Sequence, residues 1–517
     1  MSDFLDAVEN RVSEWPYPVD YNKENEVNTD VLIVGGGIAG CHAAINAAKR
    51  GARVAVVDKG PVIRSGNGGA GIDHWHGACT NPCSKITPDE YIEYYRKNRS
   101  GLATSEYGSG ATTYIMFRES YDAVLDLEKW GVKVRDEDDE FKGAEFRDEE
   151  TKLLFAYDYK NRNVLRVQGA NVKPALYYEC QKQGVDIYDR IMMTGLLTEE
   201  GQLAARVVGA TGVHAHTGEF YVFKAKAIIL SSGPSVGLWA FSTELAGANA
   251  AHDDPNCVGD GNAMAWDAGA EFTLMEASAR TGGGFRYPAY GTGNAHNTWF
   301  ACTLVDANGK EVPWVDRDGR ILKTVSERYR PAPGQRIFYH GPPPLPYELQ
   351  GPRLIPDLPE RIMKGEYVLP FYADLPGMPE HERRAIFGLM VGHEGKTHIA
   401  IYDHYTEAGF DPDKHMLQAN VLPPEEAGMH IPWWNSMGPP QWRETAFGGG
   451  GGLVFDWDLK STLDGLYAAG NQLAGGSNHA GAAATGRYAG RKAAEYAKMA
   501  AEPVIHRDQV EKEKTRV

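Results

Sequence analysis

A glycine-rich turn between two apolar segments, "DVLIVGGGIAGCHAAINAAKRGARVAVVD", restricts the fold of this chain more than any other stretch. Residues 30–34 predict a buried strand, the Ala-rich run from Ile38 to about Lys49 predicts a helix, and residues 53–57 predict a second strand. A strand, a tight turn and a helix in this order are typical of a doubly wound α/β sheet.

The glycines of this turn have the G-x-G-x-x-G spacing of a dinucleotide site. Gly35 permits the turn, Gly37 lets the backbone approach a pyrophosphate at the helix N-terminus, and Gly40 lets the helix pack closely on the strand. Asp58 closes the second strand, where its carboxylate can accept ribose hydroxyls. The motif thus assigns to a dinucleotide Gly35, Gly37, Ile38, Ala39, Gly40 and Asp58.

A second glycine cluster follows at once, in "DKGPVIRSGNGGAG", with four glycines among residues 66–71. A single phosphate-binding loop needs only one such cluster. The second is therefore either a flexible surface loop or a backbone segment that a ligand must approach closely.

Composition indicates a large enzyme of the cytoplasm. The 517 residues exceed the roughly 250–300 at which a single core stops growing, so two domains are expected. The 53 basic and 69 acidic residues, net charge −16, disfavour a nucleic-acid or anionic membrane surface. No apolar run approaches the ~20 residues of a membrane helix, and the acidic N-terminal stretch predicts no secretion signal.

Six scattered cysteines do not form a disulfide framework. Cys79 and Cys83 have no nearby histidine or second pair at zinc spacing, and no Cys-x-x-Cys-x-x-Cys run is present. We therefore expect no metal and no iron–sulfur cluster on this chain.

The rest of the chain predicts a β-meander that runs into a buried strand, residues 227–230, ending in Ser231, Ser232 and Gly233. A turn at residues 259–261 then opens a helix. From about Ala277 to Gly428 prolines cluster and the strand–helix pattern stops, which indicates an inserted domain.

These motifs, in their order, resemble flavoproteins of the succinate dehydrogenase and fumarate reductase superfamily. They are the GGGIAG start, "RSGNGGAG", "KAKAIILSSG", "GDGNAMA" and the C-terminal "GLYAAGNQLAGGSNHAGAAATGRYAGR". "AGAEFT" is similar to the flavin subunit of adenylylsulfate reductase. The resemblance implies FAD rather than NAD, and an α/β fold: a Rossmann-like (GR2-type) FAD-binding domain, residues 1–276 plus 430–517, with an inserted α+β capping domain, residues 277–429.

Within this resemblance the second glycine cluster corresponds to the loop that lies against the flavin ring. Membrane-complex members bond a histidine early in this loop covalently to the flavin, whereas the matching residues here are Ile63, Arg64, Ser65 and Gly66. The resemblance therefore implies non-covalent FAD. It adds as cofactor-binding residues Lys59, Ser65, Gly66, Asn67, Gly68, Gly69, Ala70, Gly71, Ser232, Gly233 and Asp260.

In the family, the C-terminal loop and the following helix meet the ribityl chain and the pyrimidine edge of the flavin. Here they imply contacts from Gly470, Asn471, Ser477, Asn478, His479 and Ala480. The helix dipole would favour the charge that builds near flavin N1 on reduction. Asn471 replaces an acidic residue that is common at that position.

The dicarboxylate-binding histidine and arginine of the family correspond here to Phe447 and Leu473, which predicts a more apolar or aromatic substrate. Candidate catalytic groups are Arg280, His74, His76 and Arg443. Each has a structural alternative, an ion pair for an arginine or a satisfied hydrogen bond for a histidine.

Three functions stay open. The first is hydride transfer between flavin N5 and an activated carbon–carbon bond of a small organic substrate. The second is sulfur chemistry like that of adenylylsulfate reductase, with a separate iron–sulfur electron-transfer subunit. The third is a non-catalytic flavoprotein subunit. Self-association into a homo-oligomer also stays open.

Overall fold

A computed structural model gives the structure of the chain. It describes residues 20, 22–69, 71–72, 74–97, 110–139, 141–143, 147–155, 161–167, 169–234, 256–275, 279–280, 302–316, 318–324, 327–328, 353–382, 411, 413–419, 444–445, 451–474 and 478–517.

A seven-stranded sheet forms the centre of the fold, in the order β5-β2-β1-β8-β7-β6, with β20 also pairing with β8. The strands are β1 (Glu24–Val34), β2 (Val54–Asp58), β5 (Asp186–Asp189), β6 (Ile191–Thr198), β7 (Val207–His214), β8 (Phe220–Leu230) and β20 (Leu466–Ala468). Pairs β1–β2, β1–β8, β2–β5 and β8–β20 are parallel, whereas β6–β7 and β7–β8 are antiparallel. The protein is therefore α/β with a mixed sheet.

Strand β8 has different neighbours along its two halves. On one side it pairs with β1 over its whole length. On the other side residues 220–224 pair with β7, and residues 228–230 pair with β20 from the C-terminal part of the chain. The carboxyl ends of β1, β2, β8 and β20 consequently meet at one edge of the sheet.

The predicted first strand is confirmed but starts earlier than the apolar pattern indicates. Residues 31–34 are buried and pair with both β2 and β8, which accounts for their continuous apolar character. Residues 24–29 pair with β8 and have no β2 partner. Their sequence, "ENEVNT", is polar because this half of β1 lies at the margin of the sheet.

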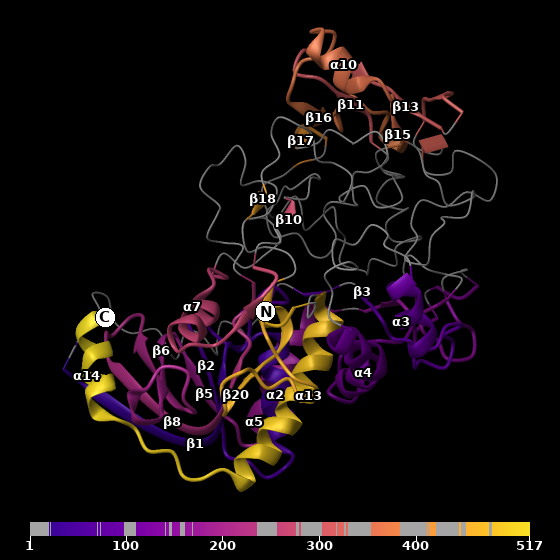
Figure 1. The fold of residues 1–517 in the computed structure, drawn as a ribbon. Coiled ribbons are helices and arrows are strands. Elements are labelled where there is room, and N and C mark those ends of the chain that lie inside the picture. The colour runs from indigo at the N-terminus through magenta and orange to yellow at the C-terminus, as the bar shows by residue number, and fades with distance from the viewer. Residues whose placement is uncertain are drawn as a thin grey trace.

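Helices α2 (Ile38–Ala48), α5 (Val172–Lys182) and α13 (Asn478–Met499) gather beside the sheet (Figure 1). Helix α2 is buried over almost its whole length, with α13 on β1 and β8 and α5 next to α2. Helix α4 (Gly110–Lys129) packs on α13, and α3 (Pro88–Lys97) packs on α4. Helices α7 (Asp260–Asp267) and α14 (Arg507–Arg516) pack near β6.

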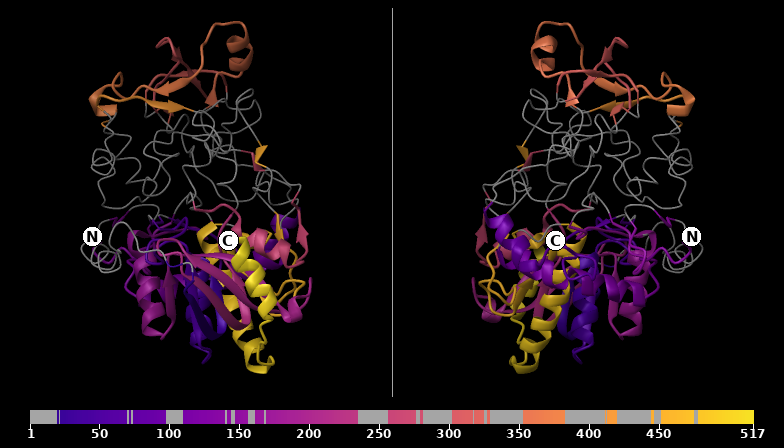
Figure 2. Two further views of the ribbon diagram at one scale, coloured as in Figure 1. Left: turned by 90° about the vertical axis from the view of Figure 1, so that its left-hand side faces the viewer. Right: turned by 90° about the vertical axis from the view of Figure 1, so that its right-hand side faces the viewer.

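Shorter elements connect these parts and form small sheets. They are β3 (His74–Trp75), β4 (Leu165–Arg166), η1 (Gly169–Asn171), η2 (Glu199–Gly201), β9 (Phe272–Thr273), β10 (Ala279–Arg280), β11 (Leu304–Val305), β12 (Glu311–Val312), β13 (Trp314–Val315), β14 (Ile321–Leu322), β15 (Arg353–Leu354), α10 (Leu358–Met363), β16 (Phe371–Ala373), β17 (Leu417–Ala419), β18 (Glu444–Thr445), β19 (Gly452–Leu453) and η5 (Gly470–Gln472). The antiparallel sheets β12-β11-β16-β17 and β14-β13-β15, with α10, lie at the end of the molecule away from the main sheet (Figures 1 and 2).

Candidate functional site

The carboxyl edge of the parallel strands brings together segments from both ends of the chain. The Gly35 N–H donates to Val57 O at 2.8 Å, and the Ser231 N–H donates to Val34 O at 2.8 Å. The Ala469 N–H donates to Leu230 O at 2.9 Å. The turns that follow β1, β2, β8 and β20 are therefore tied to one another. A ligand crevice is expected at this edge of an open α/β sheet.

The first glycine loop leaves the N-terminus of α2 open. Gly35 has φ +99°, and a Cβ there would lie 2.6 Å from Ser231 O. A Cβ on Gly40 would lie 1.9 Å from Gly35 O, so the helix packs directly on the turn. By contrast, a Cβ on Gly37, the N-cap of α2, would meet no described atom within 4 Å. No described side chain caps α2 and no acidic residue lies in its first turn, so its N–H groups suit an anion.

The second glycine cluster packs directly against the first. A Cβ on Gly66, which has φ +77°, would lie 3.2 Å from Gly37 Cα. A Cβ on Gly68 would lie 2.4 Å from Ile38 Cδ1. The two glycine loops therefore lie in direct contact, while the expected close approach of a ligand to the second cluster stays a prediction. Ala70 lies outside the described residues.

Hydrogen bonds within the cluster fix its path. The Gly69 N–H donates to Gly66 O at 2.8 Å, the Gly71 N–H donates to Gly68 O at 3.1 Å, and Arg64 Nη1 donates to Gly69 O at 3.2 Å. Of the two side chains predicted to contact a ligand here, Ser65 is buried, and its hydroxyl lies 3.5 Å from Val62 O. Asn67 lies 3.5 Å from the Cys257 thiol.

Asp58 contacts the first glycine loop from the end of β2. Its Oδ2 accepts the Gly36 N–H at 2.7 Å and its Oδ1 accepts the Gly60 N–H at 2.7 Å. Burial raises the pKa of the Asp58 carboxyl, while these two N–H groups and the charge of Lys173 act in the opposite direction. Each oxygen of the Asp58 carboxylate thus already accepts one backbone hydrogen bond. Its expected hydrogen bonds with ribose hydroxyls stay a prediction.

Lys173 reaches the same loop, and the sequence reasoning did not identify it. This α5 side chain is fully buried, and its Nζ donates to Gly36 O. The Cys41 thiol lies 3.4 Å from Nζ and itself donates to Gly36 O at 3.2 Å. The available signal was a lysine in helical register with the apolar residues Leu176 and Cys180.

The predicted residues Lys59 and Asp260 form an ion pair that links the end of β2 to the start of α7. Their side chains are only partly exposed, at 23% and 29%. Two positions 201 residues apart are thereby placed at the same edge of the sheet.

Three buried oxygens beside this edge have no hydrogen-bond partner among the described residues. They are Ser232 Oγ, Asn262 Oδ1 and Gln472 Oε1. Gln472 Nε2 donates to Gly233 O at 2.7 Å, which connects η5 to the end of β8. A Cβ on Gly261 would lie 2.3 Å from Ser232 Oγ and 2.7 Å from Gln472 Oε1, so those two oxygens flank one point. Unpaired buried acceptors of this kind suit a ligand that brings hydroxyl or N–H donors.

The C-terminal loop contacts the first helix. Gly470 has φ +64°, and a Cβ there would lie 3.1 Å from the Ala39 Cβ. Its N–H donates to Thr485 Oγ1 at 2.9 Å. Asn478 caps α13, because its Oδ1 accepts the Gly481 N–H at 2.9 Å. We expected the free N–H groups at the start of α13 to face the flavin. One of them, the Gly481 N–H, instead donates to the Asn478 side chain.

The other described residues that were predicted in this loop lie in η5 and in the first turn of α13. Asn471 lies in η5, partly exposed. His479 is partly buried and Ala480 fully buried in the first turn of α13. Ser477 lies outside the described residues.

The two histidine candidates lie together near strand β3. Their rings, His74 and His76, stand edge to face with centroids 4.6 Å apart. In the β3–β4 ladder His74 is opposite Arg166. The Ser120 hydroxyl donates to His76 O at 2.8 Å, and the Trp75 indole N–H reaches the same hydroxyl at 2.8 Å. The histidine segment is thus anchored on α4.

One of the two arginine candidates, Arg280, lies in a short two-stranded ladder. Strand β10 pairs antiparallel with β18, so the backbone of Arg280 is opposite Glu444. Arg443 immediately precedes Glu444 in the sequence but lies outside the described residues. Two segments far apart in the sequence therefore meet in one short ladder.

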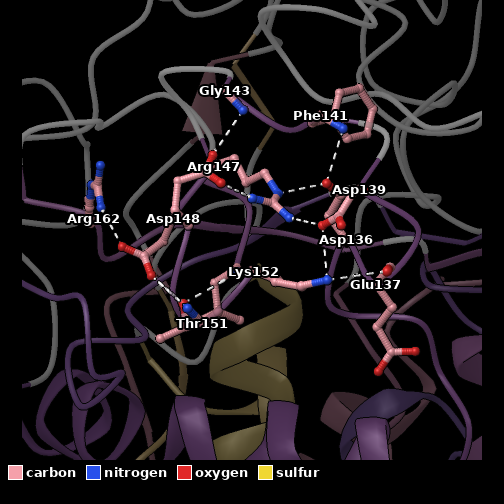
Figure 3. Close-up of polar contacts among 12 residues, drawn as sticks. Asp136, Glu137, Asp139, Phe141, Gly143, Arg147, Asp148, Thr151, Lys152 and Arg162 are labelled. Carbon is pink, nitrogen blue, oxygen red and sulfur yellow. Dashed lines mark hydrogen bonds and ion pairs between the residues drawn. The ribbon is translucent and has the colours of Figure 1, made fainter.

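A charged cluster between α4 and β4 was not predicted (Figure 3). Arg147 and Asp136 form an ion pair at 2.7 Å with both side chains 2% exposed, and Arg147 also binds Asp139 and, at 2.5 Å, Glu149. The Phe141 N–H donates to Asp136 Oδ2 at 3.0 Å.

A second set of contacts extends this cluster toward β4. The Thr151 N–H and hydroxyl bind Asp148 at 2.8 and 2.9 Å, and Arg162 Nη1 binds it at 3.1 Å (Figure 3). Since its charges bind one another, the cluster holds in place the segment that leads to β4 and hence to His74.

Within the described residues, no group of three or more His, Cys, Asp or Glu side chains could hold a metal ion. No described helix is both long and apolar enough for a membrane span.

Residues 30–279, just under half of the chain, match the family model described as FAD binding domain. Over 267 residues the chain is 28% identical to a fumarate reductase (CoM/CoB) polypeptide of Methanothermobacter marburgensis, a match that covers 50% of this chain and 43% of that protein. Over 251 residues it is 25% identical to a probable fumarate reductase of Shewanella frigidimarina, covering 48% and 40%. The chain spans about four tenths of the length of these curated relatives.

Among solved structures, adenylylsulfate reductase from Archaeoglobus fulgidus is similar, with a TM-score of 0.63 at 22% identity. The similarity covers 98% of this chain and 76% of that chain. At this identity it shows a shared fold.

Proposed function

We propose that the chain is an FAD-dependent oxidoreductase of the succinate dehydrogenase and fumarate reductase flavoprotein superfamily, since residues 30–279 match the FAD binding domain model. The reaction would transfer a hydride between flavin N5 and an activated carbon–carbon bond of an organic substrate other than a C4 dicarboxylate. The observation that carries this proposal is the contact between the two glycine loops at the carboxyl edge of the sheet, Gly66 against Gly37.

The residues at this edge fit FAD. The open N-terminus of α2 at Gly37 would hold the pyrophosphate. The glycines of the second cluster, Gly66, Gly68, Gly69 and Gly71, would let a flat ring lie close to the backbone, since they carry no side chain. The unpartnered oxygens of Ser232, Asn262 and Gln472 supply acceptors beside it. FAD bound there would supply a two-electron acceptor and donor for the substrate.

We propose that the FAD is held without a covalent bond. Residues 63–66 are Ile63, Arg64, Ser65 and Gly66, so no histidine occupies the family's attachment position. The two nearest histidines, His74 and His76, belong to the β3 segment that α4 anchors.

The domain division belongs to this proposal. A GR2-type FAD domain would comprise residues 1–276 and 430–517, with residues 277–429 as an α+β cap. In its support, β20 and α13 join the main sheet and its helices, whereas strands β11 to β17 and α10 form separate small sheets.

Proton transfer to or from the substrate carbon would fall to Arg280. Its strand β10 pairs with β18, which follows the second candidate, Arg443. A guanidinium stays cationic and can relay a proton only through neighbouring groups. Leu473, buried next to η5, replaces the family's substrate-binding arginine, and this supports a substrate without two carboxylates.

The test uses the purified yellow protein. Acid precipitation should release all flavin, and colour on the pellet would contradict non-covalent binding. After anaerobic photoreduction, the protein is mixed with fumarate, enones, aromatic acrylates or adenylylsulfate, and reoxidation is followed at the flavin absorbance band.

Reoxidation by enones or acrylates at least about tenfold faster than by fumarate is the expected result, and Arg280→Lys should slow it by about 10²-fold. A sulfite adduct with AMP-dependent turnover would replace this proposal with sulfur chemistry. Reoxidation by none of these acceptors would favour the non-catalytic alternative.

A further inference from the structure

We propose that Lys173 is a positioning residue for the dinucleotide: from behind the first glycine loop it holds the Gly36 carbonyl, so that the N-terminus of α2 stays open to the pyrophosphate. The inference rests on FAD binding at this edge and not on the reaction proposed above.

Both backbone polar groups of Gly36, its carbonyl and its N–H, are held by hydrogen bonds. The Gly36 carbonyl accepts from Lys173 Nζ and from the Cys41 thiol at 3.2 Å. The Gly36 N–H donates to Asp58 Oδ2 at 2.7 Å. A Cβ on Gly36 would lie 2.7 Å from Val62 Cγ2, which fixes the third side. Gly36 therefore cannot rotate without breaking contacts to β2, α2 and α5.

A fully buried lysine needs a reason, because an unpaired ammonium is costly away from water. Asp58 compensates part of this cost, since the charge of Lys173 acts on its carboxyl. The described contacts of Nζ are a carbonyl and a thiol, and neither carries a full charge when the thiol is protonated. While the Cys41 thiol is protonated, a pyrophosphate bound at the adjacent helix N-terminus would add to this compensation.

A second consequence falls on Cys41. The hydrogen bond with the Cys180 thiol, assisted by the charge of Lys173, lowers the pKa of the Cys41 thiol to about 7 against the opposing effect of burial. A thiolate absorbs ultraviolet light more strongly than a thiol. The ionisation of Cys41 can therefore be followed by absorbance, independently of turnover.

The experiment compares Lys173→Met with the parent and with Lys226→Met as matched control. Lys226 is a partly buried lysine in the middle of β8 that forms ion pairs with Asp30 and Glu502 instead of contacting the glycine loops. FAD dissociation on dilution is followed by flavin fluorescence, and ADP is titrated as a competitor that contains the pyrophosphate but no flavin ring.

For Lys173→Met we expect both FAD and ADP to bind about tenfold or more weakly, while Lys226→Met stays within about twofold of the parent. The Cys41 titration, measured as thiolate absorbance against a Cys41→Ser background, should move to higher pH. If Lys173→Met does not fold, Lys173→Gln is used instead. Its amide can still donate a hydrogen bond but carries no charge, and the same FAD, ADP and Cys41 titrations then test the proposal.

Dissociation constants within twofold of the parent would overturn the proposal, as would an unchanged Cys41 titration. A protein that binds FAD but reoxidises with none of the acceptors would overturn the proposed reaction and leave this inference standing.

Discussion

At the scale of single residues, the first turn of α2 holds polar groups that the dinucleotide motif does not describe. Cys41 follows directly after the motif, and Lys173 and Cys180 reach it from α5. Gln472 fixes the segment after β8 in a similar way, because its Nε2 donates to Gly233 O. Cys41, Lys173 and Cys180 fix a loop rather than contacting a ligand themselves, whereas Gln472 fixes a loop through Nε2 and leaves Oε1 for a ligand.

The Cys41 thiol predicts a pH dependence of stability. Its pKa is about 7 in the folded protein and 9.0 ordinarily, so between pH 7 and 9 the folded state has lost a proton that the unfolded state retains. The free energy of unfolding should therefore rise with pH across this window, by roughly 2 kcal/mol in total, and be lost as the pH falls through 7. Urea unfolding midpoints at pH 7, 8 and 9 measure this, with Cys41→Ser expected to lack the rise.

The matched control is Cys302→Ser. Burial raises the pKa of that thiol, so it does not titrate in the window, and its variant should follow the parent curve. Parallel curves for the parent and Cys41→Ser would contradict the lowered pKa. Cys180, whose pKa the hydrogen bond with Cys41 and burial raise, also stays protonated up to pH 9.

The motif predicted where the glycines lie because their spacing reflects local turn geometry. Gly35, Gly37 and Gly40 could be placed from sequence alone. The positive φ of Gly35 and the close contact of Gly40 with Gly35 agree with the turn and the packing assigned to them, whereas the pyrophosphate contact of Gly37 stays a prediction. Lys173 could not be placed in this way, since it lies 137 residues from Gly36 and only the packing of α5 on α2 joins them. A buried lysine looks the same in a sequence as one that is solvated.

At the scale of elements, α13 and α2 pack through backbone rather than side chains. A Cβ on Gly486 would lie 2.2 Å from Ala39 O, and a Cβ on Gly490 would lie 2.2 Å from Ala43 O. Two glycines one turn apart thus let the last long helix approach the dinucleotide helix closely. Several of the neighbouring positions of α13 are buried alanines, which keeps this contact narrow.

We expect Gly490→Ala to separate these helices and to destabilise the protein by about 1–3 kcal/mol, the usual cost of overpacking. Because α2 carries the open N-terminus, FAD affinity should fall as well. The urea midpoint and FAD retention on gel filtration are the measurements. Gly110→Ala, at the start of α4 where a Cβ would meet no described atom within 4 Å, serves as control. Equal midpoints for both variants would rule this packing argument out.

Helices and strands with a strong pattern were predictable, whereas paired segments with a polar sequence were not. The helix after Gly37 and the strand ending at Leu230 appear where periodicity places them. The first half of β1 and the two-residue strands β10 and β18 depend on partners elsewhere in the chain. No local window contains that information.

At the scale of the whole molecule, the main sheet is built from the beginning, the middle and the end of the chain. Strand β8 receives β1 on one side and both β7 and β20 on the other. The order of motifs predicted this return of the C-terminal part only through the family resemblance. Strand pairing follows from three-dimensional packing and not from hydrophobic period.

The proposed division into two domains predicts where proteases cut first. The proline-rich stretch from Tyr329 to Pro359 should be nicked before either terminal part, because its composition disfavours regular hydrogen bonding. Limited trypsin and thermolysin digestion with mass spectrometry of the fragments locates the cuts. Early cleavage within residues 228–230, buried in β8, would contradict the division.

The late arrival of β20 has a consequence for how the protein is made. When a ribosome has synthesised β1, α2, β2 and β8, the far half of β8 still lacks its neighbour, and Gly470 with the helix behind it has yet to emerge. A nascent chain must therefore keep an exposed strand edge unpaired while the long stretch between β8 and β20 is translated. A cofactor that needs the C-terminal loop would then bind only a nearly finished polypeptide, and until that point the unpaired edge of β8 is open to aggregation.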